Sequence, residues 1–371
     1  MGDCHLRHRF TFRLRKVGSI LLILLLASCS KESVNTEQSE QTAGATLQIM
    51  VMFAPGQLGD KGFADSVMEG LNAIEAQDDT VGVDSIDVCY MSPLDAQDAL
   101  RSLDRWAGSA ARLFSDGEYE RRLLILTEPY MADWLKDISG SLRPTDEVLF
   151  LKSNEDDISK ISGQYSLENR VHGLNISASA SAVKFSKYIL RWMKNEGMTA
   201  ADRHEINVFR LYDKEEYRYR DDLVETLQRE LGDSVVFREI AMVGLKDSAG
   251  NVMNTTQDMV EIAYDMAFYS GLYCETLGFP YVLVDLGAGN AGWDYYLMSN
   301  SWNGIYTLIL DAKKASRLDR YYIYRNFGLA VNDWVHEWKQ KSAGEMDIQK
   351  THYDDRYCED NIFPIEESDP E

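Results

Sequence analysis

The chain is poor in cysteine, and its cysteines are far apart. It has 5 in 371 residues; Cys4 and Cys29 lie near the N-terminus, and Cys89, Cys274 and Cys358 are scattered over the rest. An odd number without short spacings argues against a disulfide framework and against a zinc site. We expect Cys89 to be a packing residue in a strand and Cys274 to be one in a helix. A disulfide that involves Cys358 is left as an open alternative.

Signatures of catalysis are missing as well. There is no G-x-S-x-G elbow, no P-loop and no H-E-x-x-H motif. The histidines beyond the N-terminal segment are His172, His204, His336 and His352, and none lies near a cysteine or at metal-ligand spacing. The sequence therefore favours binding over turnover, with no cofactor and no metal expected.

Positive charge is scarce relative to negative charge. Lysine and arginine number 38 against 60 acidic residues, which gives a formal net charge of −22. Such a surface repels nucleic acid and anionic lipid headgroups, so neither is expected as a partner. Acidic residues spread over helix faces form a solvated surface, so this charge does not describe a ligand site.

The N-terminal apolar run is too short to span a membrane. Residues 17–29 read V-G-S-I-L-L-I-L-L-L-A-S-C, about a dozen apolar residues where a spanning helix needs roughly 20. Five basic residues precede this run, which is typical of a secretory signal. The ending L-A-S-C resembles the lipobox of bacterial lipoproteins, which implies that Cys29 carries acyl chains and becomes the new N-terminus.

The lipobox reading sets the expected location of the protein. Two or three acyl chains hold a protein firmly on a membrane. We therefore expect residues 1–28 to be removed and the chain to be tethered through Cys29 outside the cytoplasm, in the cell envelope. An uncleaved membrane anchor is the alternative. Residues 29–46 are polar, contain no aromatic side chain and are predicted to be a flexible tether.

From Leu47 onward, strand-like and helix-like segments alternate. The predicted strands are Leu47–Ala54, Ser85–Tyr90, Arg122–Thr127, Glu147–Lys152, Glu205–Tyr212, Ser234–Ile240, Tyr281–Leu286, Ile305–Leu310 and Tyr321–Tyr324. The predicted helices are Lys61–Ala76, Leu94–Phe114, Tyr130–Ile138, His172–Asn195, Glu215–Leu231, Thr256–Leu277, Trp293–Asn300 and Phe327–Lys341. This order is typical of parallel sheets with helices on both faces.

Chain length favours two lobes over one, because the part after the tether exceeds what one compact core usually holds. We expect two doubly wound α/β lobes joined by a hinge, with the change near Ser153–Gly173. The first lobe is assigned residues 47–153 plus 325–345, and the second residues 154–324 plus 346–371. Ligands of such sheets bind beyond the carboxyl ends of the strands, so we expect a cleft between the lobes.

The first strand, turn and helix carry a specific resemblance. Phe53–Leu71 reads F-A-P-G-Q-L-G-D-K-G-F-A-D-S-V-M-E-G-L and resembles the N-terminal motif of the basic membrane protein family, close to G-x-x-D-D-K-S-F-N-x-S-x-x-E-G-L. The matching residues are Gly56, Asp60, Lys61, Phe63, Ser66, Glu69, Gly70 and Leu71. Gly59 and Gly62 replace the family's Asp and Ser.

This family contains nucleoside-binding lipoproteins of ABC importers with the type I periplasmic-binding-protein fold. The later chain is similar in element order: Val282–Gly292 looks like a strand and glycine-rich loop, Leu308–Ala312 like a strand ending in Asp, and Tyr321–Trp334 like the last strand and helix. The resemblance implies a small-molecule ligand such as a nucleoside, and an ABC permease as a partner.

Four candidate ligand residues lie around the first helix. The resemblance implies that Phe63 stacks on a nucleobase, and the alternative is a core phenylalanine. Asp60, next to Lys61, accepts hydrogen bonds either from ligand hydroxyls or from the helix N-terminus as a cap. Asp65 lies one turn inside the helix and is a further candidate.

A glycine-rich loop follows the strand 281–286. Its candidates are Gly287, Gly289 and Asn290, because glycine lets a backbone approach a ligand closely. The alternative is an ordinary strand–helix turn, and the G-x-G-x-x-G spacing carries little weight for a dinucleotide in an exported protein. Trp293 begins an aromatic cluster that either clamps a base or sugar, or packs between the lobes.

Three charged residues complete the candidate set. Glu128 and Asp311 each follow a predicted strand, where side chains point toward the cleft, although Asp311 could instead cap the next segment. Arg325 lies near a family lysine that faces the ligand, and its alternative is an ion pair with a surface acid, which contributes little energy.

Taken together, these features favour a lipid-anchored, extracytoplasmic solute-binding protein that captures a small polar ligand, such as a nucleoside, for ABC-type import. A sensory or accessory surface lipoprotein of the same fold is the alternative. A glycan-active hydrolase is a third hypothesis, and it requires two carboxylates about 5–10 Å apart across the cleft.

Overall fold

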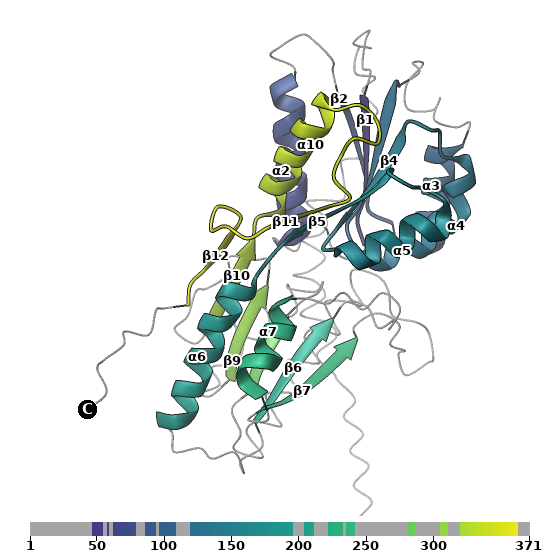
Figure 1. The fold of residues 1–371 in the computed structure, drawn as a ribbon. Helices are drawn as coiled ribbons and strands as arrows, with labels where there is room; N and C mark the ends of the chain where they lie inside the picture. Colours follow the sequence, from purple (N-terminus) through teal and green to yellow (C-terminus); the bar gives the residue numbers. More distant parts are fainter. Residues whose placement is uncertain are drawn as a thin grey trace, which may run out of the picture. The chain divides into compact units, whose positions relative to one another are not determined.

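The fold comes from a computed structural model, and Figure 1 shows its elements along the chain. The structure describes residues 47–54, 58, 62–78, 86–93, 96–108, 119–195, 204–210, 222–232, 235–241, 281–285, 305–310 and 320–362. All of them belong to one compact unit, Gly44–Glu371. The predicted signal, Cys29, the tether and the predicted helices 256–277 and 293–300 lie outside the described residues.

The first sheet has six strands, all paired in parallel. In spatial order they are β11 (Gln349–His352), β5 (Val171–Ile176), β4 (Asp146–Leu151), β3 (Arg121–Leu126), β1 (Leu47–Met52) and β2 (Ile86–Met91). Strands β1, β4 and β5 are buried along their whole length. Burial on both faces fits the apolar runs 49–52 of β1 and 148–151 of β4, whereas β5 reads V-H-G-L-N-I and buries polar residues as well.

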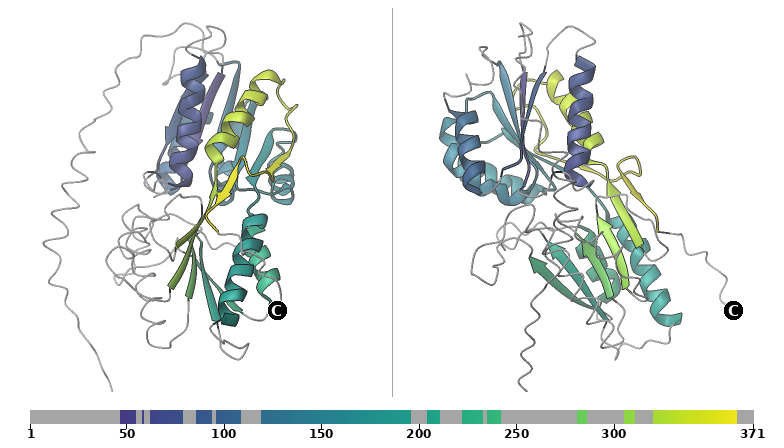
Figure 2. Two further views of the ribbon diagram at one scale, coloured as in Figure 1. Left: turned by 90° about the vertical axis from the view of Figure 1, so that its left-hand side faces the viewer. Right: turned by 180° about the vertical axis from the view of Figure 1, so that it is seen from behind.

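Helices cover both faces of this sheet (Figures 1 and 2). Helices α2 (Phe63–Asp78) and α10 (Phe327–Gln340) pack on one face; α3 (Ala96–Ala107), α4 (Ala132–Ile138) and α5 (Glu155–Tyr165), with the 3₁₀ turns η3 (Pro129–Met131) and η4 (Ser139–Ser141), belong to the other side.

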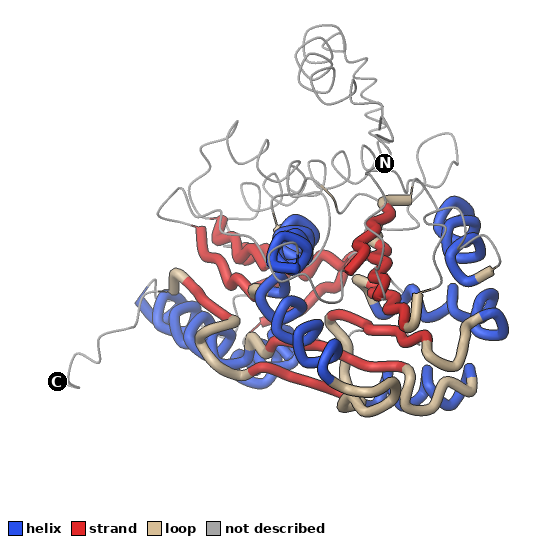
Figure 3. The backbone as a smooth tube through the Cα atoms, turned by 90° about the horizontal axis from the view of Figure 1, so that it is seen from above, coloured by secondary structure: helices blue, strands red, loops and turns tan. Residues whose placement is uncertain are grey.

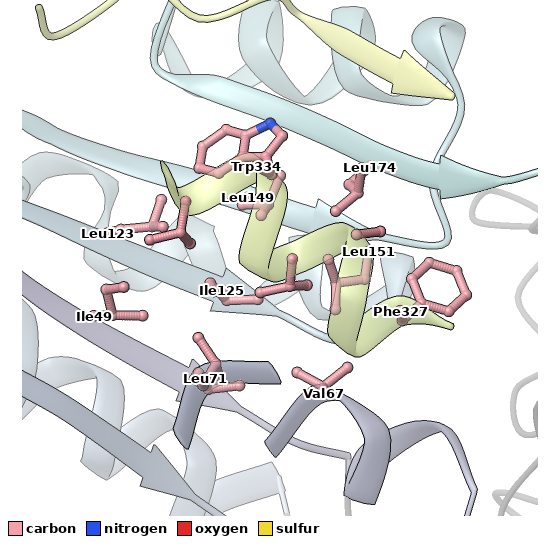
Figure 4. Packing of buried hydrophobic residues seen from close by; sticks show 14 of the residues in the cluster. Ile49, Val67, Leu71, Leu123, Ile125, Leu149, Leu151, Leu174, Phe327 and Trp334 are labelled. Atoms are coloured by element: carbon pink, nitrogen blue, oxygen red, sulfur yellow. The ribbon is translucent and has the colours of Figure 1, made fainter. Parts of the chain in front are cut away.

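Side chains of β1 alternate between these two faces. Ile49 and Val51 join the core under α2 and α10, whereas Met50 and Met52 join the core under α3 and α4. This is the period of two expected for a strand. Figure 4 shows the first of these cores, in which Trp334 and Phe327 of α10 lie among the side chains of the strands and of α2.

The second sheet also has six strands. In spatial order they are β12 (Cys358–Asp360), β10 (Arg320–Arg325), β9 (Ile305–Leu310), β8 (Tyr281–Asp285), β6 (His204–Arg210) and β7 (Val235–Ala241). The pairings are parallel except β10 with β12. Helices α6 (Ser179–Asn195) and α7 (Asp222–Leu231) supply most of the buried residues of its core. Figure 3 separates these strands and helices by colour.

Three connections link the two sheets. The chain leaves the first sheet after β5 and enters α6, returns from β10 into α10, and leaves again between β11 and β12. Backbone hydrogen bonds join these connections. Ser177 N, directly after β5, donates to His352 O at the end of β11, and Asn326 N, directly after β10, donates to Tyr357 O, directly before β12. The α/β fold class with two doubly wound sheets is therefore confirmed.

One element prediction was wrong. The segment 172–195 was expected to be a single helix, but it contains β5, a break at Ser177 and Ala178, and then α6. Strand β5 forms because it pairs with β4 and with its neighbour β11. A Cβ on Gly173 would come within 1.9 Å of Oε1 of Gln349 in β11, the end of a flexible side chain. That neighbour comes from distant sequence and leaves no local signal.

The strand pairing also differs from the predicted lobe extents. Strands β5 and β11 lie in the first sheet, although 154–324 and 346–371 were assigned to the second lobe. Helix α10 packs in the core of the first sheet, as its assignment required, whereas Arg325 is the last residue of β10 in the second sheet. Helix α5 in the predicted junction was not foreseen.

Candidate ligand-binding site

The candidate site lies at the carboxyl edge of the first sheet. Strands β3 and β4 are parallel neighbours, with Leu126 opposite Phe150, so they end side by side. Glu128 follows β3 by two residues, and Lys152 directly follows β4. Helix α2 begins at Phe63, in the connection after β1. Parallel open sheets bind their ligands at this edge.

Lys152 connects these residues. Its Nζ lies 2.9 Å from Oε1 of Glu128 and 3.6 Å from the centre of the Phe63 ring. The side chains of Lys152 and Glu128 are 7% and 12% exposed. A buried ammonium group is costly unless paired, and here a carboxylate and an aromatic face together compensate the lost hydration.

The backbone of Lys152 adopts an uncommon conformation. Its φ is 54°, in the left-handed region that favours glycine. The turn is stabilised on its C-terminal side: Ser153 Oγ donates to Phe150 O, and Asn154 caps α5 by accepting from Asp157 N. Non-glycine residues in this region store strain and concentrate at functional sites.

Phe63 is 4% exposed and belongs to the core under α2 and α10. Phe327 meets it in an edge-to-face contact, with ring centres 5.0 Å apart at 84°. The structure therefore supports the packing role for Phe63, and the Lys152 ammonium lies over its ring. Base stacking on Phe63 is not tested here and stays a prediction.

Arg325 is also buried, at 1% exposure, with its guanidinium 5.4 Å from the centre of the Phe327 ring. This burial does not fit an ion pair at the surface. Residues near it join both β10 and α10 to α2: Tyr324 of β10 donates to Ser66 Oγ at 3.1 Å, and Gly328 N of α10 donates to the same oxygen at 3.1 Å. The Phe327 ring therefore lies between Arg325 and Phe63 and contacts both of them.

Asp65 is half-buried in the first turn of α2, where a carboxylate is favourable beside the helix N-terminus. Among the predicted ligand residues, the structure therefore describes Phe63, Asp65, Glu128 and Arg325. Several others lie outside the described residues: Asp60, Lys61, Gly287, Gly289, Asn290, Trp293 and Asp311.

Sequence reasoning missed Lys152. A lysine at the end of a strand is usually solvated, and that default hid it. A signal was nevertheless available: residues 148–151 are entirely apolar, and the cation follows them directly, while an acid follows the neighbouring strand. Opposite charges at the ends of adjacent parallel strands are expected to meet.

The amino edge of the same sheet carries a different charge cluster. The Glu147 side chain is fully buried and accepts hydrogen bonds from Arg121, Trp338 and the backbone N–H of Gly344, with the His172 ring 3.3 Å away. Burial alone would raise the pKa of Glu147, but the hydrogen bonds from His172, Arg121, Gly344 and Trp338 lower it to about 2. These partners come from β3, β5, α10 and the segment after α10, so the cluster joins the elements.

A buried pair next to Glu147 completes this edge. Arg122 binds Asp146 in a bidentate ion pair, with Nε to Oδ1 at 2.9 Å and Nη2 to Oδ2 at 2.5 Å. Its guanidinium also lies 4.4 Å from the centre of the Trp106 ring. The charges at the amino edge are thus joined to several packed elements, which is the pattern of a structural cluster.

The described residues contain no group of three or more histidine, cysteine or acidic side chains that could hold a metal ion. Cys89 is half-buried, and burial together with Asp87 and Glu75 raises the pKa of its thiol to about 12. The thiolate form is therefore disfavoured at neutral pH.

Among the helices that the structure describes, none is long and apolar enough to cross a membrane.

The chain matches no family model and no curated protein. It is similar to solved structures: a solute-binding protein of an ABC transporter system from Aeropyrum pernix (13% identity, TM-score 0.52, 82% of this chain and 74% of that one) and an ABC sugar transporter subunit from Rhodobacter sphaeroides (10% identity, TM-score 0.51, 84% and 96%). A third is a glucose-galactose binding protein from Geobacillus stearothermophilus (12% identity, TM-score 0.51, 85% and 96%). These likenesses show the type I periplasmic-binding-protein fold.

Proposed function

We propose that this protein is an extracytoplasmic solute-binding protein that captures a small polar ligand between its two lobes for ABC-type import. One observation carries the proposal: the buried Lys152–Glu128 pair against Phe63 lies at the carboxyl edge of a parallel sheet. That edge is where open α/β sheets bind ligands. The fold shared with solute-binding proteins of ABC transporters supports the same role.

Binding is favoured over turnover by the composition of this edge. A lysine, a carboxylate and a phenylalanine provide one cationic donor, one anionic acceptor and an apolar surface. They offer directed hydrogen bonds and an apolar contact to a small polar solute. Hinge closure over the ligand would complete the site and present a surface to a permease.

The ligand class has two lines of support. Solved structures of the same fold are named as glucose-galactose and arabinose binding proteins, which favours a sugar. The motif in Phe53–Leu71 resembles the basic membrane protein family, which favours a nucleoside. We propose the full ligand set of the sequence analysis, with Lys152 added: Asp60, Lys61, Phe63, Asp65, Glu128, Gly287, Gly289, Asn290, Trp293, Asp311 and Arg325.

Thermal-shift screening against nucleosides, sugars and amino acids tests the proposal. A ligand at a hundred times its dissociation constant stabilises the folded state by about 2.7 kcal/mol. We expect at least one solute to raise the melting temperature and to be recovered chemically unchanged. No shift with any solute, or a solute consumed during incubation, would contradict a binding role.

The membrane attachment is a separate part of the proposal. We propose that Cys29 is acylated after removal of residues 1–28 and that residues 30–46 tether the folded part to the membrane. Replacing Cys29 by Ala should abolish labelling with radioactive palmitate and leave the leader uncleaved. The Cys89→Ala variant is the matched control, because Cys89 is half-buried; if Cys29→Ala keeps the label, the lipid anchor is wrong.

A further inference from the structure

The Lys152–Glu128 pair places a cationic donor and an anionic acceptor 2.9 Å apart at the carboxyl edge of the first sheet. We propose that it is the specificity element of the ligand site and that it recognises two neighbouring hydroxyl groups of an uncharged ligand. This inference rests on the proposed function. The chemistry is shared by a monosaccharide and by the ribose of a nucleoside, and the test below separates the two.

Hydrogen-bonding capacity is the first argument. An ammonium group has three N–H donors and a carboxylate has only acceptor sites. Within the described part of the chain, Glu128 is the acceptor that Lys152 Nζ contacts, while the Phe63 ring faces the same nitrogen. A hydroxyl can accept from Lys152 while its neighbour donates to Glu128, so a vicinal diol matches this donor and acceptor 2.9 Å apart.

The backbone gives the second argument. Lys152 has φ 54°, a conformation that L side chains rarely adopt and that glycine adopts without strain. Its long side chain is nevertheless buried, with the residue 6% exposed. A position where glycine would fit more easily thus holds an ammonium group at the ligand edge of the sheet, which points to a use of the charge itself.

Charge balance gives the third argument, and it predicts selectivity. The two charges of the pair are 2.9 Å apart, so a ligand carboxylate at Lys152 would also lie close to Glu128, and a ligand ammonium at Glu128 would also lie close to Lys152. Each pays a like-charge penalty that an uncharged hydroxyl avoids. The ammonium also lies over the Phe63 ring, which Phe327 contacts edge-to-face.

Isothermal titration calorimetry on the full folded chain tests this role. The panel is ribose, arabinose, glucose, galactose, glucosamine, glucuronate, uridine and 2′-deoxyuridine. The variants are Lys152→Met and Glu128→Gln, which keep side-chain length, and each melting temperature is measured to verify folding. Lys184→Met is the matched control, because Lys184 also contacts an acid, Asp360, at 2.9 Å but is 53% exposed.

We expect the wild type to bind at least one uncharged member of the panel and to discriminate against the charged sugars. Lys152→Met should weaken the affinity for the uncharged ligand by about tenfold or more, because a hydrogen bond to a charged group is lost. Lys184→Met should leave this affinity unchanged. The variants should also shift selectivity in opposite directions: Lys152→Met toward glucosamine and Glu128→Gln toward glucuronate. A purely structural pair would not produce this reciprocal shift.

The two sources of the diol give different results. Tight binding of a free sugar identifies a monosaccharide, whereas uridine bound in preference to 2′-deoxyuridine identifies the ribose of a nucleoside. If the wild type binds a panel member and Lys152→Met binds it equally well, the specificity role is wrong while the binding function stands. If the wild type binds nothing in the panel or prefers a charged sugar, the inferred ligand class is wrong.

Discussion

At the scale of single residues, Glu147 shows how this sheet keeps a buried carboxylate ionised. Its oxygens accept from Arg121, Trp338 and Gly344 N at the amino edge of the first sheet. Each donor comes from a different element or connection, so the carboxylate organises several parts of the first sheet at once. Removing its charge leaves buried donors without a charged acceptor, and losing one partner of a buried ion pair strongly destabilises the folded state.

Replacing Glu147 by Gln should therefore lower the free energy of unfolding by about 3 kcal/mol. Urea denaturation followed by circular dichroism measures this change. The control is Glu337→Gln, because Glu337 makes equally short contacts with Lys341 and Lys350 but is 33% exposed. Its effect should be much smaller, because exposed ion pairs contribute little; equal effects of the two variants would show that Glu147 is not a structural centre.

The same residue predicts a pH dependence. Its pKa is lowered to about 2 in the folded state, against about 4.3 for an unfolded glutamate. A lowered folded pKa stabilises the protein above the unfolded pKa, and this contribution disappears as the pH falls from about 4.3 through about 2. The stability difference between wild type and Glu147→Gln should be constant from pH 7 to 5 and shrink below pH 4. A difference that is independent of pH would contradict the assignment.

Residue-scale prediction of the site from sequence was limited by burial. Glu128 was named because it follows an apolar strand, but its partner Lys152 was not, since no local pattern reveals that a lysine is buried. Phe63 was placed correctly on the first helix, yet its contacts with Phe327 and Lys152 join residues far apart in the chain. The missing information was in each case a tertiary contact.

At the scale of elements, α2 and α10 approach each other closely because two glycines face across their contact. A Cβ on Gly70 would lie 2.1 Å from Gly328 O, and one on Gly328 would lie 2.0 Å from Ser66 O. Both obstacles are backbone atoms, so no side-chain rotation relieves them. The two helices therefore pack at a distance that only glycine permits at these positions.

Replacing Gly328 by Ala should push the two helices apart and destabilise the protein by about 1–3 kcal/mol. Gly163→Ala in α5 is the opposite control: no atom lies within 4 Å of its added Cβ, and alanine is the better helix former, so it should stabilise by about 1 kcal/mol. Thermal unfolding of both variants measures the contrast. A neutral Gly328→Ala variant would mean that the helices can separate at no cost.

Elements were predicted well where their pattern is local. The apolar strands β1, β3 and β4 and the helices α2 and α10 lie close to their expected positions, because burial on one or both faces imposes the expected periodicity. Strands β11 and β12 are short, consist mostly of polar residues that are half-buried or exposed, and were not foreseen. They exist because they pair with β5 and β10, at the connections between the sheets.

At the scale of the whole molecule, the chain combines a strongly acidic composition with a small neutral charge pair at the proposed ligand edge. The net charge of −22 acts over the surface, and we expect it to disfavour contact with nucleic acid and anionic surfaces. The ligand edge instead presents one buried cation and one carboxylate. The two properties are compatible, because surface charge is screened by solvent and salt while buried groups interact directly.

The central claim is that a small solute binds at the carboxyl edge of the first sheet. Amide hydrogen exchange followed by mass spectrometry, with and without a solute that raises the melting temperature, tests it most directly. We predict slower exchange with ligand in peptides covering residues 62–66, 126–130 and 150–154, and unchanged exchange at the amino edge in residues 119–123 and 144–148. Protection confined to the amino edge, or unchanged exchange at residues 126–130 and 150–154 with saturating ligand, would contradict the claim.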